Sequence, residues 1–302
     1  DNGGKKINRL RLIESLRLAE SETVVLNESS NDTTSLLESS MLAANRKHAH
    51  MGPHFLDTEK ALLDTLTKDH VLSITHINNF LNVEKGGPMV FLENNLLRFP
   101  QAKTAPLGYG TALHGVLNQA LVYLKKEGTY PTLQMCTEWY TEYLKYERLA
   151  NGEHKVNLDR GIDALKQIYV EKILTLKGDE LSEVDFKHEG VVLTDGTTYV
   201  PVAGKIDLIR FADKDSKNVY VCDYKTGKEK KDWKGKDNHE KVQLHFYKQQ
   251  LTFYKLLLKK SKNFSHMHVL GGQLEFLETK GDRLIVLSDE IADEEVERLE
   301  KL

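Results

Sequence analysis

The sequence predicts an α/β protein in which a mixed β-sheet is flanked by helices. Two segments, 201–211 and 219–225, are apolar, rich in β-branched and aromatic residues, and alternate as strands do. The stretch 241–260 follows without Gly or Pro and ends in basic residues, as is typical of a helix. The dipeptide Asp195-Gly196 stands between two alternating runs, 183–193 and 198–211, and signals a β-hairpin. Strands and helices are therefore interspersed, which favours a sheet with helical layers.

Length and composition set limits on this protein. The chain has 302 residues and 40% hydrophobic content, enough for one large core or for a main domain with a smaller appendage. Charged residues make up 29%, and the sequence has neither an apolar run of about 18 residues nor a signal-peptide pattern, so we expect a soluble, cytoplasmic protein without membrane contact. The formal net charge of −3 provides no general attraction for nucleic acid. A DNA-binding surface would have to be local.

The first 69 residues show helical patterns that are separate from the strand-rich remainder. A short apolar run at 23–26 and a polar, turn-like segment at 27–34 interrupt them. We expect residues 1–69 to be a helical remnant or linker from a preceding region, and residues 70–302 to form the main domain. The predicted helices of this first portion cover residues 7–20, 35–48 and 57–69.

The main domain is predicted to begin with helices and to continue with strands. The predicted helices cover residues 111–127, 132–148 and 158–176, and a terminal amphipathic helix falls within 289–300. The predicted strands cover residues 183–193, 198–211, 219–225, 266–278 and 283–287.

Asp207, Asp223 and Lys225 form the candidate reactive centre. Asp223 and Lys225 share one face of their strand, because side chains alternate with period two. The polar segment 212–217 suits a hairpin that sets Asp207 beside Asp223. Two neighbouring carboxylates in a half-buried sheet repel each other unless a cation lies between them. The pattern therefore predicts a divalent metal site of the phosphodiesterase kind, and the alternative is a charged strand end beside a hairpin.

The triplet Asp-x-Lys is weak evidence by itself, because the chain contains four copies of it. Only the copy at Asp223 closes a continuous strand pattern and has a second Asp on a neighbouring strand. Glu183 and Glu189, on the strand before the hairpin, are weaker candidates for an additional carboxylate.

The helix 241–260 carries a polar stripe. Gln243, Tyr247, Gln250 and Tyr254 are spaced i, i+4, i+7 and i+11, so two amides and two phenols line one side. These groups could steady the catalytic Lys or contact a phosphate. The alternative is an ordinary amphipathic helix with a solvated flank.

A lysine-rich segment follows the second strand and is the candidate DNA-binding loop. Six lysines fall between residues 225 and 236, with Trp233 among them, and such a loop could follow a phosphate backbone. A solvated loop is the alternative. The residues predicted to bind DNA are Lys228, Lys230, Lys231 and Lys234 of this loop, with Gln243 and Tyr247 of the helix.

Several motifs resemble one nuclease family. Gly204-Lys-Ile-Asp207, Asp223-Tyr-Lys-Thr-Gly-Lys228 and Gln250-Leu-Thr-Phe-Tyr254 look like successive motifs of the RecB-like branch of the PD-(D/E)xK nuclease superfamily. The Gly-Thr-x-x-His pattern that ends at His114 looks like the histidine motif of that branch. The segment 72–81 resembles the Ser-initiated helix with which many such domains begin. The resemblance covers about residues 70–302 and is strongest to nuclease domains of UvrD/Rep, RecB or AddB-type helicases.

The resemblance implies a restriction-endonuclease-like fold and a nuclease that uses Mg²⁺ or Mn²⁺. It implies DNA as the partner, as single strands or duplex ends, and exonuclease or endonuclease cleavage that leaves a 5′-phosphate. It also implies a helicase domain in the same chain or complex, and a role in DNA repair or recombination. The implied metal ligands are His114, Asp207, Asp223 and the carbonyl of Tyr224, and the implied catalytic residues are Asp207, Asp223, Lys225, Gln250 and Tyr254.

Cysteine usage differs from that of some relatives, which hold an iron-sulfur cluster with four cysteines. This chain contains only Cys136 and Cys222, so we expect no cluster and assign both to the core. No Walker-type loop occurs, so we expect no nucleotide cofactor. Two other interpretations stay open: a non-catalytic DNA-binding or architectural module with the same fold, and an α/β scaffold whose motifs are coincidental.

Overall fold

The computed structural model describes residues 53–194, 196–213 and 217–301. By internal packing the chain divides into two compact units, residues 1–63 and 64–302. The predicted helices 7–20 and 35–48 and the run 23–26 lie outside the described residues. The predicted helix 57–69 corresponds to α3 (Pro53–Thr67).

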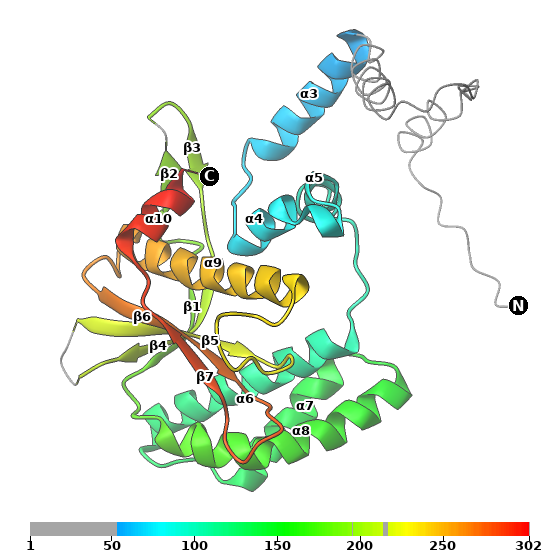
Figure 1. The fold of residues 1–302 in the computed structure, drawn as a ribbon. Coiled ribbons are helices and arrows are strands. Elements are labelled where there is room, and N and C mark those ends of the chain that lie inside the picture. The colour runs from blue at the N-terminus through cyan, green and yellow to red at the C-terminus, as the bar shows by residue number, and fades with distance from the viewer. Residues whose placement is uncertain (1–52, 195, 214–216, 302) are drawn as a thin grey trace, which may run out of the picture. The chain divides into compact units, whose positions relative to one another are not determined.

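A mixed five-stranded sheet forms the centre of the second unit (Figure 1). Its order is β1-β4-β5-β6-β7, in which β5 and β6 are parallel and the other neighbours are antiparallel. This arrangement confirms the predicted fold class. The strands are β1 (Leu181–Asp185), β4 (Lys205–Phe211), β5 (Asn218–Lys225), β6 (His268–Phe276) and β7 (Val286–Asp289).

Two strands form a separate hairpin. β2 (Val192–Thr194) pairs antiparallel with β3 (Tyr199–Pro201), which confirms the hairpin predicted from the Asp-Gly dipeptide. The single predicted strand 198–211 is therefore wrong, because the chain leaves the hairpin before β4 begins. Leu72 bridges the chain at this break: its N–H donates to the Pro201 carbonyl, and its own carbonyl accepts from the N–H of Ala203.

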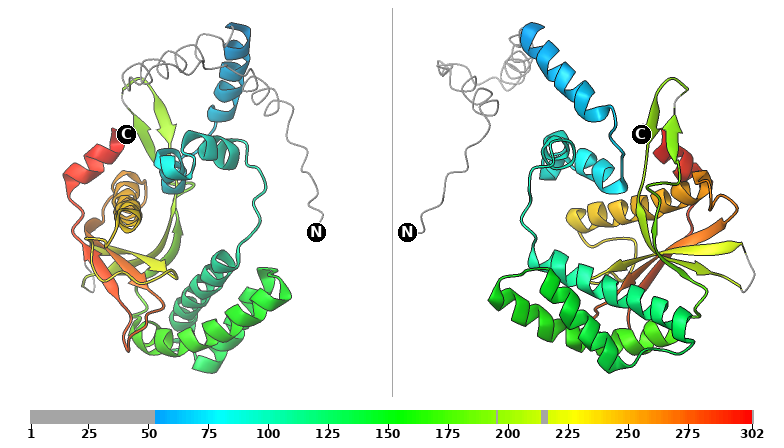
Figure 2. Two further views of the ribbon diagram at one scale, coloured as in Figure 1. Left: turned by 45° about the vertical axis from the view of Figure 1, so that its right-hand side comes forward. Right: turned by 180° about the vertical axis from the view of Figure 1, so that it is seen from behind.

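Helices cover both faces of the sheet (Figure 2). Helix α9 (Asn238–Lys260) lies on one face, next to α4 (Ile74–Leu81) and α10 (Asp293–Glu300). The other face carries α6 (Ala105–Glu127), α7 (Leu133–Tyr146) and α8 (Asn151–Glu171). Short helical segments occur at η1 (Val83–Lys85), α5 (Pro88–Phe91), η2 (Leu92–Leu96) and η3 (Ile173–Thr175). Among the described helices, none combines the length and apolar character that a membrane span requires.

Alternation along β5 divides its side chains between two cores. Val219 and Val221 pack on the α9 side, whereas Cys222 and Tyr224 pack on the α6 side. Cys222 is fully buried in the core, as predicted, and its side chain lies on the face opposite Asp223. Cys136 is likewise buried within α7.

Helix α6 begins six residues earlier than predicted, at Ala105 and not at 111. Pro106 is tolerated in the first turn, where its missing N–H costs nothing. Gly108 and Gly110 lie inside the helix, although glycine disfavours helix by about 1 kcal/mol. His114 therefore belongs to the third turn of α6.

Helix α8 provides a test of its contact with α7. A Cβ added at Gly161 would overlap the ring of Tyr140, which is fully buried and donates a hydrogen bond to the Asn157 carbonyl at 2.7 Å. We expect Gly161→Ala to lower the free energy of unfolding by about 1–3 kcal/mol, because overpacking outweighs the better helix propensity of alanine. Gly152→Ala is the matched control in the same helix, because no atom lies near its added Cβ, and it should stabilise by about 0.4–1 kcal/mol. Urea denaturation measures both, and equal effects would contradict the packing argument.

Candidate metal centre

Strands β4 and β5 separate at the end that carries Asp207. Their pairing runs from Leu208–Cys222 to Phe211–Val219 and stops there. Beyond it, the Asp207 carboxylate enters between the strands and its Oδ2 accepts the backbone N–H of Tyr224 at 2.8 Å. A side chain thus replaces a backbone acceptor, which fixes the carboxylate at the end of the β4–β5 pairing.

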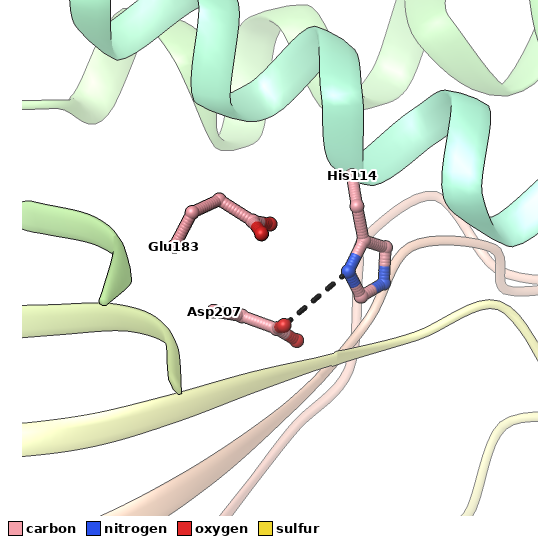
Figure 3. A group of neighbouring side chains, drawn as sticks. All are labelled: His114, Glu183 and Asp207. Carbon is pink, nitrogen blue, oxygen red and sulfur yellow. Dashed lines mark ion pairs between the residues drawn. The ribbon is translucent and has the colours of Figure 1, made fainter. Parts of the chain in front are cut away.

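Three elements bring metal-binding groups to this end of the sheet (Figure 3). His114 comes from α6, Asp207 from β4 and Glu183 from β1, and one potential ligand atom of each lies within 4.8 Å of the other two. His114 Nδ1 is 3.4 Å from Asp207 Oδ1. All three side chains are partly exposed, between 14 and 25%, so an ion can reach them.

Glu183 adopts a conformation that strands rarely contain. Its φ is +54°, in the left-handed region that is costly for residues other than glycine. Such strain persists only where the surroundings impose it, and it is frequent at functional sites. The distortion interrupts the pairing of β1 with β4 between Ser182 and Val184, and the Glu183 side chain is directed toward Asp207 and His114.

Gly110, four residues before His114, has a packing role. A Cβ at Gly110 would lie 2.9 Å from Thr226 Oγ1, so a side chain at this position would push α6 away from the loop that follows β5. The glycine allows the close approach that places His114 over the end of the sheet. The ring of His114 also makes an edge contact with Tyr224, at 5.6 Å between centroids.

Asp223 and Lys225 belong to a closed ring of hydrogen bonds with α9. Lys225 Nζ is 2.6 Å from Asp223 Oδ2 and donates to Gln250 Oε1 at 2.8 Å. Gln250 Nε2 donates to Tyr254 Oη at 2.8 Å, and Tyr254 Oη donates to Asp223 Oδ1 at 2.8 Å. Asp223 is 2% exposed, so this ring supplies the partners that a buried carboxylate requires.

The stripe predicted on the long helix is present, and it continues this network. Tyr247 offers its ring to Lys225, at 4.6 Å from the ammonium nitrogen to the centroid. Gln243 Nε2 donates to Tyr247 Oη at 2.9 Å. All four polar residues of the stripe therefore contact one another or the β5 side chains, which the alternative of a merely solvated flank does not predict.

The pKa values of the two aspartates of the centre are shifted in opposite directions. Burial raises the pKa of Asp223, and the neighbouring charge of Asp207 raises it further. Burial also acts on Asp207, but the contact with His114 and the Tyr224 N–H outweigh it and hold its pKa below the usual value. Lys225 is desolvated, yet the Asp223 charge outweighs burial and raises its pKa, so the ammonium form persists at neutral pH.

The predicted DNA-binding lysines fall into two groups. Lys230 is buried and its ammonium is 2.8 Å from Glu240 Oε1, so the structure commits it to an ion pair instead of an open surface. Lys228, Lys231 and Lys234 are exposed. The loop is anchored by Trp233, whose Nε1–H donates to the Ser288 carbonyl at 2.8 Å and whose ring lies against Lys248.

The donor set suits a hard divalent cation. Two carboxylates and an imidazole fit Mg²⁺ or Mn²⁺, and the nitrogen donor favours Mn²⁺ somewhat. Asp223 is not a member of this three-residue group, and its two oxygens contact Tyr254 and Lys225. Sequence reasoning ranked Glu183 below Asp223 as a ligand, because a kinked strand residue gives no periodic signal.

Comparisons with known proteins place the sequence in one family. The sequence matches the family described as PD-(D/E)XK nuclease superfamily over residues 72–301. No curated protein matches the chain. One similar solved structure, titled "Crystal structure of SSO0001", is 13% identical and covers 82% of this chain and 84% of that chain, with a TM-score of 0.32. Similarity at that level carries no inference about activity.

Proposed function

The chain belongs to the PD-(D/E)XK nuclease superfamily, and from this we propose that it is a metal-dependent DNA nuclease that hydrolyses phosphodiester bonds. The observation that carries the proposal is the convergence of His114, Glu183 and Asp207 at the end of the sheet where the Asp223–Lys225 pair also lies. The carboxylates and the imidazole would hold a divalent cation, and this cation and the Lys225 ammonium would offset the negative charge of a phosphodiester during hydrolysis. The presence of all these groups favours catalysis over a non-catalytic DNA-binding role.

His114, Glu183 and Asp207 would hold Mg²⁺ or Mn²⁺, and Asp223 with the Tyr224 carbonyl are the further ligands that we propose on β5. Such an ion, when bound, lowers the pKa of a water molecule and stabilises charge on a phosphate. The Asp207 carboxylate is preorganised for metal binding because the Tyr224 N–H fixes its orientation. Its lowered pKa keeps it ionised.

Lys225 supplies a positive charge on the protein side. Gln250 and the Tyr247 ring restrict its position, so little reorganisation is needed when negative charge develops on the phosphate. Its ammonium can neutralise that charge or orient the attacking water. Tyr254 donates a hydrogen bond to the Asp223 oxygen that does not contact Lys225, and thereby fixes the orientation of the Asp223–Lys225 pair.

DNA would approach over the loop that follows β5. Lys228, Lys231 and Lys234 are exposed along this loop and can contact successive phosphates, whereas Lys230 supports the loop through Glu240. Gln243 and Tyr247 extend the same surface along α9.

We also propose the wider context that the sequence motifs imply. Residues 70–302 would act as the nuclease domain, and residues 1–69 would connect it to a helicase region in the same chain or complex. A cytoplasmic role in DNA repair or recombination, with exonucleolytic or endonucleolytic cleavage, belongs to this proposal.

Labelled linear DNA tests the proposal directly. We expect single- or double-stranded substrate to be degraded with Mn²⁺ or Mg²⁺ and to stay intact with chelator, because the ligand set has no replacement for the ion. Gel analysis over time measures the reaction. DNA binding without any metal-stimulated cleavage would instead support the non-catalytic module.

A further inference from the structure

Lys205 is a partly exposed neighbour of the candidate metal centre. It lies two residues before Asp207 on β4, on the same face of that strand. Its ammonium forms an ion pair with Glu183, one of the three grouped ligands. The Lys205 side chain is 56% exposed, whereas that of Glu183 is 20% exposed. A cation of the protein thus contacts a carboxylate that a metal ion would need.

The two ammonium groups of the centre differ in how firmly they are held. Lys225 is 17% exposed and contacts Asp223, Gln250 and the Tyr247 ring. Lys205 has a long side chain in solvent, and the contact that orients it is Glu183. A divalent cation on Glu183 would neutralise the carboxylate and repel the ammonium, so Lys205 would turn outward while Lys225 stayed in place.

We propose that Lys205 is a metal-released phosphate ligand: it competes with the divalent ion for Glu183 and, once displaced, binds a phosphate of the DNA strand. This inference rests on the proposed nuclease function for its substrate. An ammonium at the rim of the centre, next to the ligands of the ion, is placed to meet a backbone oxyanion. The same displacement couples the two binding events, because the ion frees the group that DNA uses.

The competition with metal is tested by calorimetric titration of Mn²⁺ into Lys205→Met. Removing the competing ammonium should tighten Mn²⁺ binding by about two- to fivefold, as expected for a half-exposed ion pair. Lys187→Met is the control, because this exposed lysine follows β1 outside the centre, and it should leave the affinity unchanged. Lys205→Arg keeps the charge and should retain the wild-type affinity.

The contact with phosphate is tested by fluorescence anisotropy with a phosphorothioate single strand, which keeps the backbone charge and resists hydrolysis. With Mn²⁺ present, Lys205→Met should bind more weakly, and the plot of log affinity against log salt should be shallower by about 0.7. Lys187→Met and Lys205→Arg serve again as controls. Tighter metal binding together with weaker DNA binding is a combination that a merely structural lysine would not give.

Unchanged or weaker Mn²⁺ binding by Lys205→Met would overturn the proposal, and so would an unchanged salt dependence. These outcomes differ from failure of the nuclease function. If the wild-type protein bound Mn²⁺ but did not cleave DNA, the titration would still show whether Lys205 competes with the ion.

Discussion

Replacing Asp207 with Asn is expected to abolish Mn²⁺ binding detectable by calorimetry and to reduce DNA cleavage by about a thousandfold or more. Asp207 is the member of the centre that contacts both His114 and the Tyr224 backbone. Asparagine can still accept the Tyr224 N–H, so the local backbone should keep its geometry. The amide carries no charge, however, and cannot offset the charge of a divalent ion.

Asp185→Asn is the matched control for this prediction. Asp185 lies at the end of β1, is exposed, and accepts the Lys187 N–H through its own carboxylate at 2.8 Å. The two substitutions therefore make the same chemical change to a carboxylate that holds a backbone N–H. We expect the Asp185 variant to keep full metal binding and cleavage. Retained Mn²⁺ binding by the Asp207 variant, with normal thermal stability, would contradict the assigned metal centre.

Local periodicity explains which parts of this site the sequence could predict. The alternation that identified β5 also determines that Asp223 and Lys225 share a face. Helical spacing likewise predicted the polar stripe of α9, and the structure links Gln250 and Tyr254 by a hydrogen bond. In both cases a single element contains all the information, because residues at fixed spacing point to the same side.

Features that depend on distant segments could not be predicted in this way. The predicted strand 198–211 breaks where Leu72, far away in sequence, forms hydrogen bonds with Pro201 and Ala203. Helix α6 extends through two glycines because close packing against Thr226 and Glu147 compensates for poor propensity. Lys205 reaches Glu183 only because β1 pairs with β4 and bends at a left-handed residue. Tertiary contacts, which no local pattern contains, decide each of these cases.

Glu275→Gln is expected to lower the free energy of unfolding by about 3–5 kcal/mol. Glu275 is fully buried on β6, with Lys172 Nζ at 2.7 Å and Arg210 Nη1 at 2.9 Å from its two oxygens. Without the carboxylate, two partly buried cations would face each other. Thermal unfolding should show a melting temperature lower by roughly 10 °C for a unit of this size. A change within about 1 °C would show that the cations reach water and that the triplet is not truly buried.

Acid should reduce the difference in the free energy of unfolding between the wild-type protein and Glu275→Gln. Burial alone would raise the pKa of Glu275, but the charges of Lys172 and Arg210 outweigh it and hold the pKa below its ordinary value of 4.5. A carboxylate of this kind stabilises the fold fully above its unfolded pKa, and that contribution is lost as pH falls through the folded pKa. The stability gap should therefore be constant from neutral pH to about pH 5 and shrink below about pH 4.5. A gap that widened in acid would have the wrong sign for this mechanism.

A triple replacement separates the loss of charge balance from the loss of packing. Changing Lys172 and Arg210 to Met and Glu275 to Leu removes all three charges and keeps apolar bulk, so most of the lost stability should return. The position of Glu275 gives this result a bearing on the metal centre, because Glu275 pairs in register with Tyr224 across β5 and β6. Tyr224 in turn holds Asp207 through its backbone N–H. If Glu275→Gln weakens Mn²⁺ binding and the triple variant restores both stability and Mn²⁺ affinity, the triplet supports the metal centre by keeping these two strands packed, and its charges have no separate role there.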